Sequence, residues 1–455
     1  MDANTEPGRV ERTDVAVVGA GITGLVLCRE LAERGRDVVA LEAEDRPGGV
    51  IESRRVRGRV VELGPQRTRL TDPIAELVDE LDLAERVVTA PPDLPLYVYR
   101  DGRLRRAPLG PAAFLRTDLF SLAGKARFLA EPLAGPPRED ESVADYFRRS
   151  FGEEGYLHLL GPLFGGIYAS DPAQMPARHT LIPLWRAFGA PRSFVLSAAR
   201  RALAGGESPP PCSFDEGLST LTDALGEACG DRLRLDAPVS GITATERGFR
   251  VAVDGRDALA ARRVVLTVPA PVAADLLAEG DAGGEVEALG RLRYNPLAVV
   301  HLESDLERRG FGYQISLAEE GFATRGVTWN ASLFGRRGVV TAYLGGMGRE
   351  EDVGRDDEWL VERAAREFER ITGAAARPLF VHRTRVPAHD ESWSVLEDGL
   401  DAVPRGVHVC SNWESQSGIP SRVRQARRLA GELDRELEGE PGGEADEEPA
   451  GGRAP

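Results

Sequence analysis

The sequence predicts an α/β protein, α+β overall, in which a nucleotide-binding domain is interrupted by two insertions. Three observations predict this fold. A strand, a glycine-rich turn, a helix and a second strand follow one another within residues 14–49. Residues 94–205 have helical periodicity punctuated by proline, and residues 285–380 contain short β-rich runs.

Length and composition indicate a globular protein with more than one packing unit. The chain has 455 residues, 42% of them hydrophobic, and this length exceeds the usual size of a single domain. It contains no apolar run of about 18 residues, the length needed to cross a bilayer, and its charged first residues do not match a signal peptide. We therefore expect a cytoplasmic protein and leave open a peripheral membrane contact through the helical insertion.

Charge and cysteine spacing exclude several classes of partner. The formal net charge of -16 argues against a nucleic-acid surface. Four cysteines are scattered without metal-ligand spacing, and the histidines are dispersed. We expect neither a metal site nor a disulfide framework, and the oligomeric state stays open.

The order of these patterns predicts a discontinuous nucleotide-binding domain. We expect it to comprise residues 14–93, 206–284 and 381–438. Residues 94–205 would form a mainly helical insertion, and residues 285–380 a substrate domain.

Both ends of the chain are expected to lie outside the folded domains. Residues 1–13 are predicted to be a flexible leader. Residues 439–455 are rich in Gly, Pro and Glu and have almost no large apolar side chains, so they cannot bury enough surface to offset their ordering entropy. We therefore predict a disordered acidic tail.

The glycine-rich turn has the spacing of a dinucleotide fingerprint. Val15 to Val18 are predicted to form a short buried strand. Gly19, Gly21 and Gly24 follow it, and they would provide the tight turn, the close approach of the backbone to pyrophosphate and the close contact between helix and strand.

The residues after the turn complete this unit. A helix from about Ile22 to Arg34 would present its N-terminal amides to the phosphates. A second strand, Asp37 to Leu41, ends at Glu42, about 20 residues beyond the glycines, where a carboxylate can accept hydrogen bonds from ribose hydroxyls. The unit alone would suit NAD or FAD.

The next residues favour FAD. Arg46, Gly48 and Gly49 extend the pattern to E-x-x-x-R-x-G-G, and the second pair of glycines can let the chain pass along the pyrophosphate. This extended pattern resembles that of the FAD-containing amine oxidase superfamily. The domain is therefore expected to be a Rossmann-like FAD-binding domain.

Within that superfamily the chain resembles the protoporphyrinogen and coproporphyrinogen oxidase family. The segment GGVIESRRVRGRVVELGPQRTRL is similar to the strand and E-L-G-P turn of that family. GGIYASDP, SFDEGLSTLTDAL, RRVVLTVPAPVAADLL and RLRYNPLAVVHLES are similar to further passages in the same order. The resemblance is spread over most of residues 14–430.

The resemblance implies a set of FAD contacts. Gly64 to Arg67 would lie along the flavin, Val239 would contact adenine through its backbone, and a helix starting around Ile419 would point its N-terminus at the isoalloxazine. Such a helix end stabilises negative charge on the reduced flavin. The expected cofactor-binding residues are Gly19, Ala20, Gly21, Ile22, Thr23, Gly24, Glu42, Ala43, Arg46, Gly49, Val50, Gly64, Pro65, Gln66, Arg67, Val239, Ser417, Gly418 and Ile419.

The last of these segments also departs from the family pattern. The family usually has A-G-N before the helix and G-V-G-I-P-D-C at its start. This chain retains Asn412, Gly418, Ile419 and Pro420 but lacks two of the glycines and the acidic residue. The departure bears on the substrate more than on the flavin.

As the resemblance implies, the reaction would convert a porphyrinogen, proto or copro, to the porphyrin in haem biosynthesis, with dioxygen as acceptor. No catalytic residue is assigned. Phe164, Tyr168 and Trp185 are candidates for walls of the substrate cleft, and Arg178 or Arg186 for its rim. His389 takes the place of a tyrosine of the family, and we expect it to be inessential.

Two alternatives remain at this point. The first is another flavin oxidoreductase of the superfamily, such as an amine oxidase or a carotenoid-type desaturase. The second is an FAD-binding protein that has lost catalysis, a possibility raised by the altered segment before Ile419.

Overall fold

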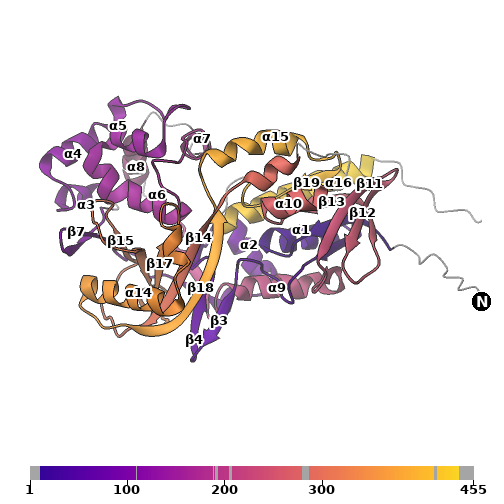
Figure 1. Cartoon of the computed structure of the whole chain (residues 1–455), viewed down its shortest axis with the longest axis horizontal. Coiled ribbons are helices and arrows are strands. Elements are labelled where there is room, and N and C mark those ends of the chain that lie inside the picture. Colours follow the sequence, from indigo (N-terminus) through magenta and orange to yellow (C-terminus); the bar gives the residue numbers. More distant parts are fainter. Residues whose placement is uncertain are drawn as a thin grey trace, which may run out of the picture.

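The computed structural model describes residues 11–108, 110–187, 189, 193–203, 208–278, 286–414 and 418–439. It is a mixed α/β structure, which confirms the predicted fold class. Two sheets occupy different halves of an elongated molecule, and helices cover their faces (Figure 1).

The first sheet contains the predicted nucleotide-binding strands. Its order is β10-β2-β1-β13-β12-β11, with β19 also paired to β13. Strands β10, β2, β1, β13 and β19 are parallel, whereas β12 and β11 form an antiparallel extension. The strands are β1 (Arg12–Val18), β2 (Val38–Leu41), β10 (Leu233–Arg234), β11 (Val239–Thr245), β12 (Gly248–Val253), β13 (Leu259–Leu266) and β19 (Val407–Val409).

Helices pack on both faces of this sheet because the central segments Val15–Val18, Val38–Leu41 and Val264–Leu266 are apolar and buried. One face packs against four helices, α1 (Ile22–Glu33), α2 (Asp72–Glu80), α9 (Ser219–Cys229) and α16 (Ile419–Gly439). The other packs against α10 (Ala270–Leu277) and α15 (Val395–Asp401). Burial on both faces is typical of parallel strands.

The second sheet has the order β18-β14-β17-β16-β15-β7-β8. Helix α14 (Asp357–Thr372) packs on one face of it through Leu360 and Phe368. The strands are β7 (Leu96–Arg100), β8 (Arg103–Arg106), β14 (Tyr294–Glu303), β15 (Gly312–Ile315), β16 (Thr324–Trp329), β17 (Val339–Gly345) and β18 (Arg377–Pro387).

A group of helices lies beyond the second sheet, at the left of Figure 1. Their aromatic side chains form a core of their own around Tyr146, Phe147 and Phe151. The helices are α3 (Pro111–Arg116), α4 (Leu122–Leu129), α5 (Val143–Gly155), α6 (Gly161–Tyr168), α7 (Leu181–Ala187) and α8 (Phe194–Leu203), with a π-helical turn at Tyr156–Leu160 between α5 and α6.

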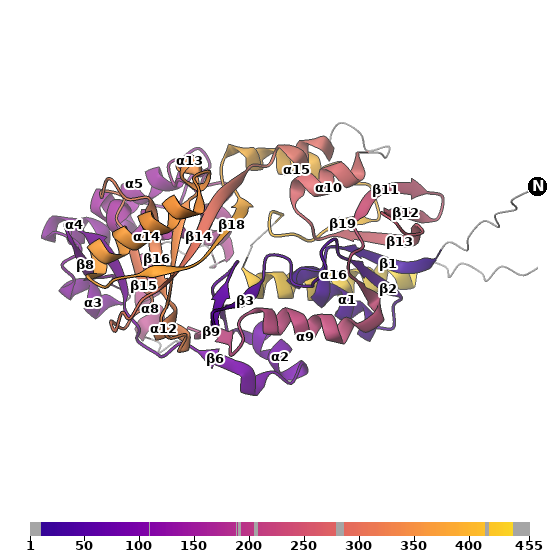
Figure 2. The same ribbon diagram turned by 60° about the horizontal axis from the view of Figure 1, so that its bottom comes forward.

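Short strands join the two halves. Hairpin β3 (Ser53–Val56) and β4 (Arg59–Glu62) leads from the first sheet toward the second, as the turned view of Figure 2 shows. A small sheet combines β5 (Thr68–Arg69), β6 (Val87–Thr89) and β9 (Pro211–Phe214). A one-turn helix, α12 (Asn330–Phe334), follows β16.

The structure changes three of the predicted boundaries. β1 begins at Arg12, and the Thr13 hydroxyl donates to the Asp37 carbonyl at 2.8 Å, so the end of the predicted leader is part of the sheet. Helix α16 continues through Gly439, the first residue of the predicted tail. Strands β7 and β8 come from the predicted helical insertion but pair with the second sheet through β15. The rest of the leader and of the tail lies outside the described residues, and the division into domains stays a prediction.

Two features are absent from the residues that the structure describes. No helix in the described ranges is long and apolar enough to span a bilayer. The same ranges contain no group of three or more His, Cys, Asp or Glu side chains placed to hold a metal ion.

Candidate functional site

The glycine turn after β1 brings backbone into positions that only glycine allows. Gly19 has a φ of +99°, and its amide donates to the Leu41 carbonyl at the end of β2. A Cβ on Gly24 would overlap with the Gly19 carbonyl oxygen. Strand and helix α1 therefore approach each other more closely than any side chain would permit, as the fingerprint predicts.

The N-terminus of α1 is open to an anion. Gly21 precedes the helix, no side chain caps it, and the first turn has no acidic residue. The first amides of a helix lack partners within the helix and carry the positive end of its dipole. Across the opening, Gly21 forms a β-bridge with Gly48, and a Cβ on Gly49 would lie 3.4 Å from the Gly21 Cα. Predicted residues Ala20, Ile22 and Thr23 are buried beside this opening.

The loop after β2 is held around Glu42. The Ala20 amide donates to Glu42 Oε2 at 2.6 Å, and the Glu44 amide donates to Oε1 at 3.1 Å. A carboxylate oxygen can accept more than one hydrogen bond, so Glu42 can still bind a ribose hydroxyl. Ala43 is exposed beside it.

Arg46 closes this loop. Its guanidinium donates to the Gly49 carbonyl at 2.9 Å and forms ion pairs with Glu44 and Glu52 at 2.9 and 3.1 Å. The arginine of the predicted E-x-x-x-R-x-G-G pattern therefore fixes the course of the second pair of glycines.

The turn that follows β4 lies against that loop. A Cβ on Gly64 would overlap with the Val50 carbonyl oxygen, and the side chain of Val50 is 62% exposed although it is apolar. Gln66 is buried and donates to the carbonyls of Glu62 and Gly64, while its Oε1 accepts no hydrogen bond within the described ranges. Pro65 stands between Gly64 and Gln66 in this turn. An exposed valine and an unsatisfied amide oxygen at one place fit a bound group.

Val239 lies beside Glu42. It begins β11, and the preceding segment is tied to the loop because the Ala237 amide donates to the Glu42 carbonyl at 2.8 Å. The backbone expected to contact adenine is therefore next to the carboxylate expected to bind ribose.

Helices α1 and α16 pack side by side with their N-termini at the same end. Glu30 pairs with Arg427 at 2.9 Å, and these residues stand eight positions after Ile22 and Ile419 respectively. The side chain of Ile419 is buried in the core that α1 shares, and Gly418 is exposed. The predicted contact Ser417 lies outside the described residues.

These segments bring together backbone groups with features that suit a dinucleotide. Glycines line the opening where a Cβ would intrude, an uncapped helix end faces it, and a carboxylate lies at the second strand. The residues present therefore fit a dinucleotide whose pyrophosphate lies at α1.

The second sheet presents polar side chains on the face opposite α14. Tyr313, Val327 and Leu344 belong to the core under α14, so their strand neighbours Gln314, Thr328 and Tyr343 point the other way. The Thr328 and Tyr343 hydroxyls are 3.1 Å apart. The sequence predicted short β-rich runs within residues 285–380 but not this polar face, although polar and apolar residues alternate along the strands.

The candidate wall residues from α6 join an aromatic row. Phe164 packs on Phe147 with ring centroids 4.9 Å apart, and Tyr168 packs on His389 at 4.5 Å. The ring of His389 lies 4.4 Å from that of Trp393, and desolvation lowers the pKa of His389 to about 4. Trp185 is half-buried and Arg186 is exposed.

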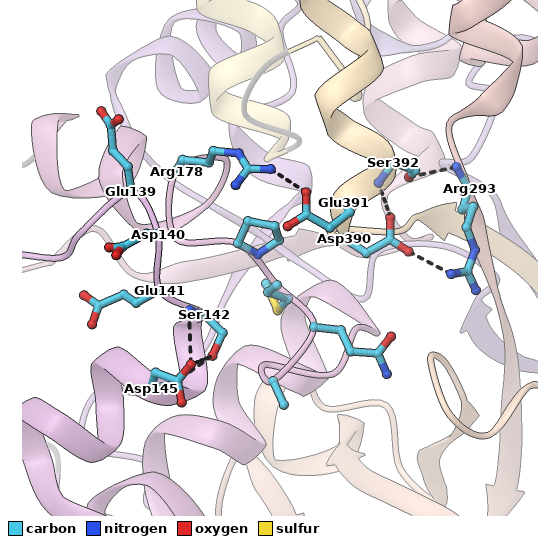
Figure 3. A pocket seen from close by; sticks show the side chains of 14 residues that line it. Glu139, Asp140, Glu141, Ser142, Asp145, Arg178, Arg293, Asp390, Glu391 and Ser392 are labelled. Atoms are coloured by element: carbon cyan, nitrogen blue, oxygen red, sulfur yellow. Dashed lines mark hydrogen bonds and ion pairs between the residues drawn. The ribbon is translucent and has the colours of Figure 1, made fainter.

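Arg178 lines a hollow of about 610 Å³ that is rich in acidic side chains (Figure 3). The hollow lies between the N-terminus of α5 and the segment after β18. The guanidinium of Arg178 pairs with Glu391, and Arg293 pairs with the buried Asp390 at 3.1 Å. The hollow is also lined by Glu139, Asp140, Glu141 and Asp145. Because Arg178 is already neutralised, the structure does not single it out as a substrate ligand.

Comparison with known proteins identifies the family of the chain. The family of flavin-containing amine oxidoreductases matches residues 22–419. Chloroplastic protoporphyrinogen oxidase of Oryza sativa subsp. japonica is 29% identical over 81% of this chain and 76% of its own length. Coproporphyrinogen III oxidase of Bacillus subtilis (strain 168) is 25% identical over 91% and 96%.

Solved structures share the fold. A protein of Exiguobacterium sp. 255-15 assigned as a protoporphyrinogen oxidase has a TM-score of 0.77 and 24% identity, covering 94% of this chain and 99% of that one. Wild-type putrescine oxidase bound to putrescine has a TM-score of 0.67 and 17% identity, with 93% and 99% covered. The resemblance stated from the sequence is confirmed. Because the fingerprint holds a dinucleotide and the family holds a flavin, the cofactor is FAD. The chain belongs to the family of flavin-containing amine oxidoreductases.

Proposed function

We propose that this FAD-dependent oxidoreductase converts a porphyrinogen to the corresponding porphyrin in haem biosynthesis, with dioxygen as the electron acceptor. The observation that carries the proposal is similarity along most of the chain to relatives named for protoporphyrinogen or coproporphyrinogen oxidation. Motifs in both halves of the molecule contribute to that similarity.

The residues predicted from the sequence are proposed to hold the cofactor as follows. The amides at the start of α1 bind the pyrophosphate, and Glu42 accepts hydrogen bonds from ribose. The turn at Gly64 and the N-terminus of α16 are proposed to contact the flavin end. When bound, FAD supplies the two-electron oxidation of the substrate.

The remaining task of the chain is to bind and orient a large tetrapyrrole. Such a ligand needs a broad apolar surface with a few polar groups for its carboxylates. The polar face of Gln314, Thr328 and Tyr343 and the aromatic row at Phe164 and Tyr168 are the surfaces that support this role. Since His389 is neutral above a pKa of about 4, it supplies no positive charge at neutral pH.

A direct assay tests the proposal. Purified holoenzyme is mixed with protoporphyrinogen or coproporphyrinogen, and porphyrin fluorescence and hydrogen peroxide are followed against a sample without enzyme. We expect fluorescence above the rate of autoxidation, with peroxide formed in step. Turnover of primary or secondary amines with no porphyrinogen oxidation would support the amine oxidase alternative and exclude the proposal.

We further propose a cytoplasmic protein with peripheral membrane contact through α3 and α4. Four leucines on or beside these helices are exposed, Leu122 and Leu133 at 85% and 89%, and the Lys125 amine lies at the Leu115 carbonyl. Exposed apolar residues beside a cation suit an anionic lipid surface. Sedimentation with anionic vesicles should carry the protein down, and the double variant Leu122→Ser, Leu133→Ser should stay in solution. Equal sedimentation of both proteins would refute this contact.

A further inference from the structure

A second hollow, of about 1020 Å³, lies toward the amino ends of the parallel strands of the first sheet. It is lined by the turn between β11 and β12, strand β13, the segment leading into β19 and the last turn of α16. The glycine turn follows the carboxyl end of β1, at the other end of the sheet. Helix α16, which runs between the two ends, has 21 residues and is about 30 Å long. The hollow is therefore separate from the proposed FAD site.

The charged side chains that line this hollow are mostly basic. They comprise five arginines and two glutamates. His408 also lines it, but desolvation lowers the pKa of His408 below the ordinary 6.5, so it adds no positive charge at neutral pH. We call the site the arginine hollow, after Arg247, Arg262, Arg263, Arg405 and Arg435. It gathers positive charge in a chain whose formal net charge is -16, and a concave cluster of one sign attracts ions of the other.

Glu436 joins three of the elements around the arginine hollow. Its Oε2 is 3.4 Å from Nε of Arg263 on β13 and 3.5 Å from Nε2 of His408 on β19. These contacts hold the last part of α16 against both strands. Arg262, also on β13, pairs with Asp14 at 3.2 Å. The two arginines of β13 therefore already face carboxylates.

The other three arginines of the hollow face no such carboxylate. Arg247 and Arg405 are exposed, and neither forms an ion pair or a side-chain hydrogen bond within the ranges that the structure describes. Arg435 donates to the neutral Gly431 carbonyl at 3.1 Å and pairs with no described carboxylate. A single exposed arginine indicates no site, but the hollow gathers three of them from three different elements. Together they can bind a partner that carries several negative charges.

The acidic end of the chain begins at the wall of the arginine hollow. Gly439, the last residue of α16, is one of the residues that line it. Residues 440–448 follow directly and span at most about 30 Å, so all of them can reach the hollow. A ligand tethered so closely has an effective concentration of about the millimolar range. Five of these nine residues are acidic, namely Glu440, Glu444, Asp446, Glu447 and Glu448.

We propose that residues 440–448 bind in the arginine hollow of their own chain, with their carboxylates paired to Arg247, Arg405 and Arg435. A planar guanidinium can hold a carboxylate through two parallel hydrogen bonds. Each pair lies near the surface and contributes little alone, so binding requires several pairs and weakens with salt. The bound segment covers the hollow and excludes other anions from it. The proposed function does not use this part of the molecule, so the inference holds whichever substrate the enzyme oxidises.

Carbodiimide cross-linking of the holoenzyme tests the contact, because this reagent joins a carboxylate to an amine without a spacer. Lys125 is the only lysine of the chain. Arg405→Lys therefore adds one amine in the hollow and keeps the positive charge. Arg116→Lys is the matched control, since Arg116 lies on α3 in the other half, is exposed and pairs with no described residue. Cross-linked monomer is digested, and fragment masses locate the joined carboxylates.

The expected products join the hollow to the acidic segment. Arg405→Lys should be joined to carboxylates within residues 440–448 at least about tenfold more often than Arg116→Lys. These products should disappear in about 1 M salt, where the Debye length is about 3 Å. Equal yields from the two variants, or products of Arg405→Lys confined to Glu246 and Glu436, would overturn the proposal.

Competition with a fluorescein-labelled peptide of residues 440–455 identifies what occupies the hollow. One variant makes the segment neutral through Glu440→Gln, Glu444→Gln, Asp446→Asn, Glu447→Gln and Glu448→Gln. The Kd of the peptide should be at least about tenfold lower for this variant than for the wild type, whose own segment competes. Adding Arg247→Ser and Arg405→Ser should abolish that gain. Equal binding of the peptide to the wild type and the neutral variant, or binding to neither, would refute the proposal.

Discussion

Glu62 and Arg336 form a buried ion pair across the junction between the two halves of the molecule. Glu62 Oε1 is 2.8 Å from a guanidinium nitrogen of Arg336, and the side chains are only 1% and 6% exposed. The carboxylate also accepts from the Leu218 amide at 3.1 Å. Burial raises the pKa of Glu62 above its ordinary 4.5, and the charge of Arg336 opposes that rise. The pair therefore couples β4, the strand that leads into the cofactor turn, to the loop between α12 and β17.

Removing one partner of this pair should be costly. Glu62→Leu leaves the Arg336 charge buried without an anion, so we expect unfolding free energy to fall by about 3 to 5 kcal/mol. The measurement is urea denaturation followed by tryptophan fluorescence. The double variant Glu62→Leu, Arg336→Met should recover most of the loss because no unpaired charge remains. Equal instability of the single and double variants would contradict this role.

Cofactor retention should depend on two glycines. Gly24→Ala places a Cβ onto the carbonyl oxygen of Gly19, and Gly64→Ala places one onto the carbonyl oxygen of Val50. In each variant the backbone segments of the proposed FAD site must therefore move apart. We expect both variants to be purified with less than a tenth of the wild-type FAD, measured by visible absorbance. Gly431→Ala is the control, because nothing lies within 4 Å of its Cβ; it should keep FAD and gain up to about 1 kcal/mol of helix stability. Full FAD content in Gly24→Ala would refute the claim that the close backbone approach at Gly24 is needed to bind FAD.

Acid should destabilise the fold through buried histidines. Desolvation lowers the pKa of His301 to about 3 and that of His158 to about 4, from 6.5. At pH values between the folded and the unfolded pKa of each histidine, the unfolded chain binds more protons than the folded chain. The contribution of the neutral histidines to the free energy of unfolding is therefore fully present above pH 6.5 and is lost as the pH falls toward 4. Each neutral histidine should account for about 2 kcal/mol lost between pH 7 and pH 5.

The contribution of His301 can be isolated. His301→Asn keeps a group that can bond the Thr341 hydroxyl, which lies 3.0 Å from Nδ1, but does not titrate. Urea midpoints at pH 7 and pH 5 should differ less in this variant than in the wild type. An unchanged difference would show that His301 is already protonated in the folded state or remains accessible to water.

His389 should be inessential for turnover. Its ring fills the space between Tyr168 and Trp393, and its Nδ1 is 3.3 Å from the Pro387 carbonyl. His389→Phe preserves the packing and should keep kcat within about threefold of the wild type, because an inessential group offers no transition-state contact to lose. His389→Ala should lower stability more than activity. Loss of turnover with FAD still bound in either variant would assign the ring a chemical role.

The elements of the half that contains the first sheet could be predicted from the sequence because the patterns that indicate them are local. The glycines, the helix beginning at Ile22 and the acid at Glu42 lie within one βαβ unit whose spacing is set by backbone geometry.

The side-chain contacts of the half that contains the second sheet could not be predicted from the sequence. Glu62 and Arg336 are 274 residues apart, and no local pattern indicates that they meet. The sequence places strands β7 and β8 in the helical insertion because the pairing of β7 with β15, which joins both strands to the second sheet, is long-range.

Anaerobic mixing of the holoenzyme with a porphyrinogen tests the central claim most directly. With oxygen excluded, electrons taken from the substrate must remain on the protein's cofactor. We predict that the visible absorbance of oxidised FAD disappears while air is excluded. Admission of air should restore it as porphyrin fluorescence appears, because each FAD holds only one of the several electron pairs that porphyrin formation removes. An absorbance that persists in the presence of protoporphyrinogen and of coproporphyrinogen, in protein that retains its FAD, would contradict the account.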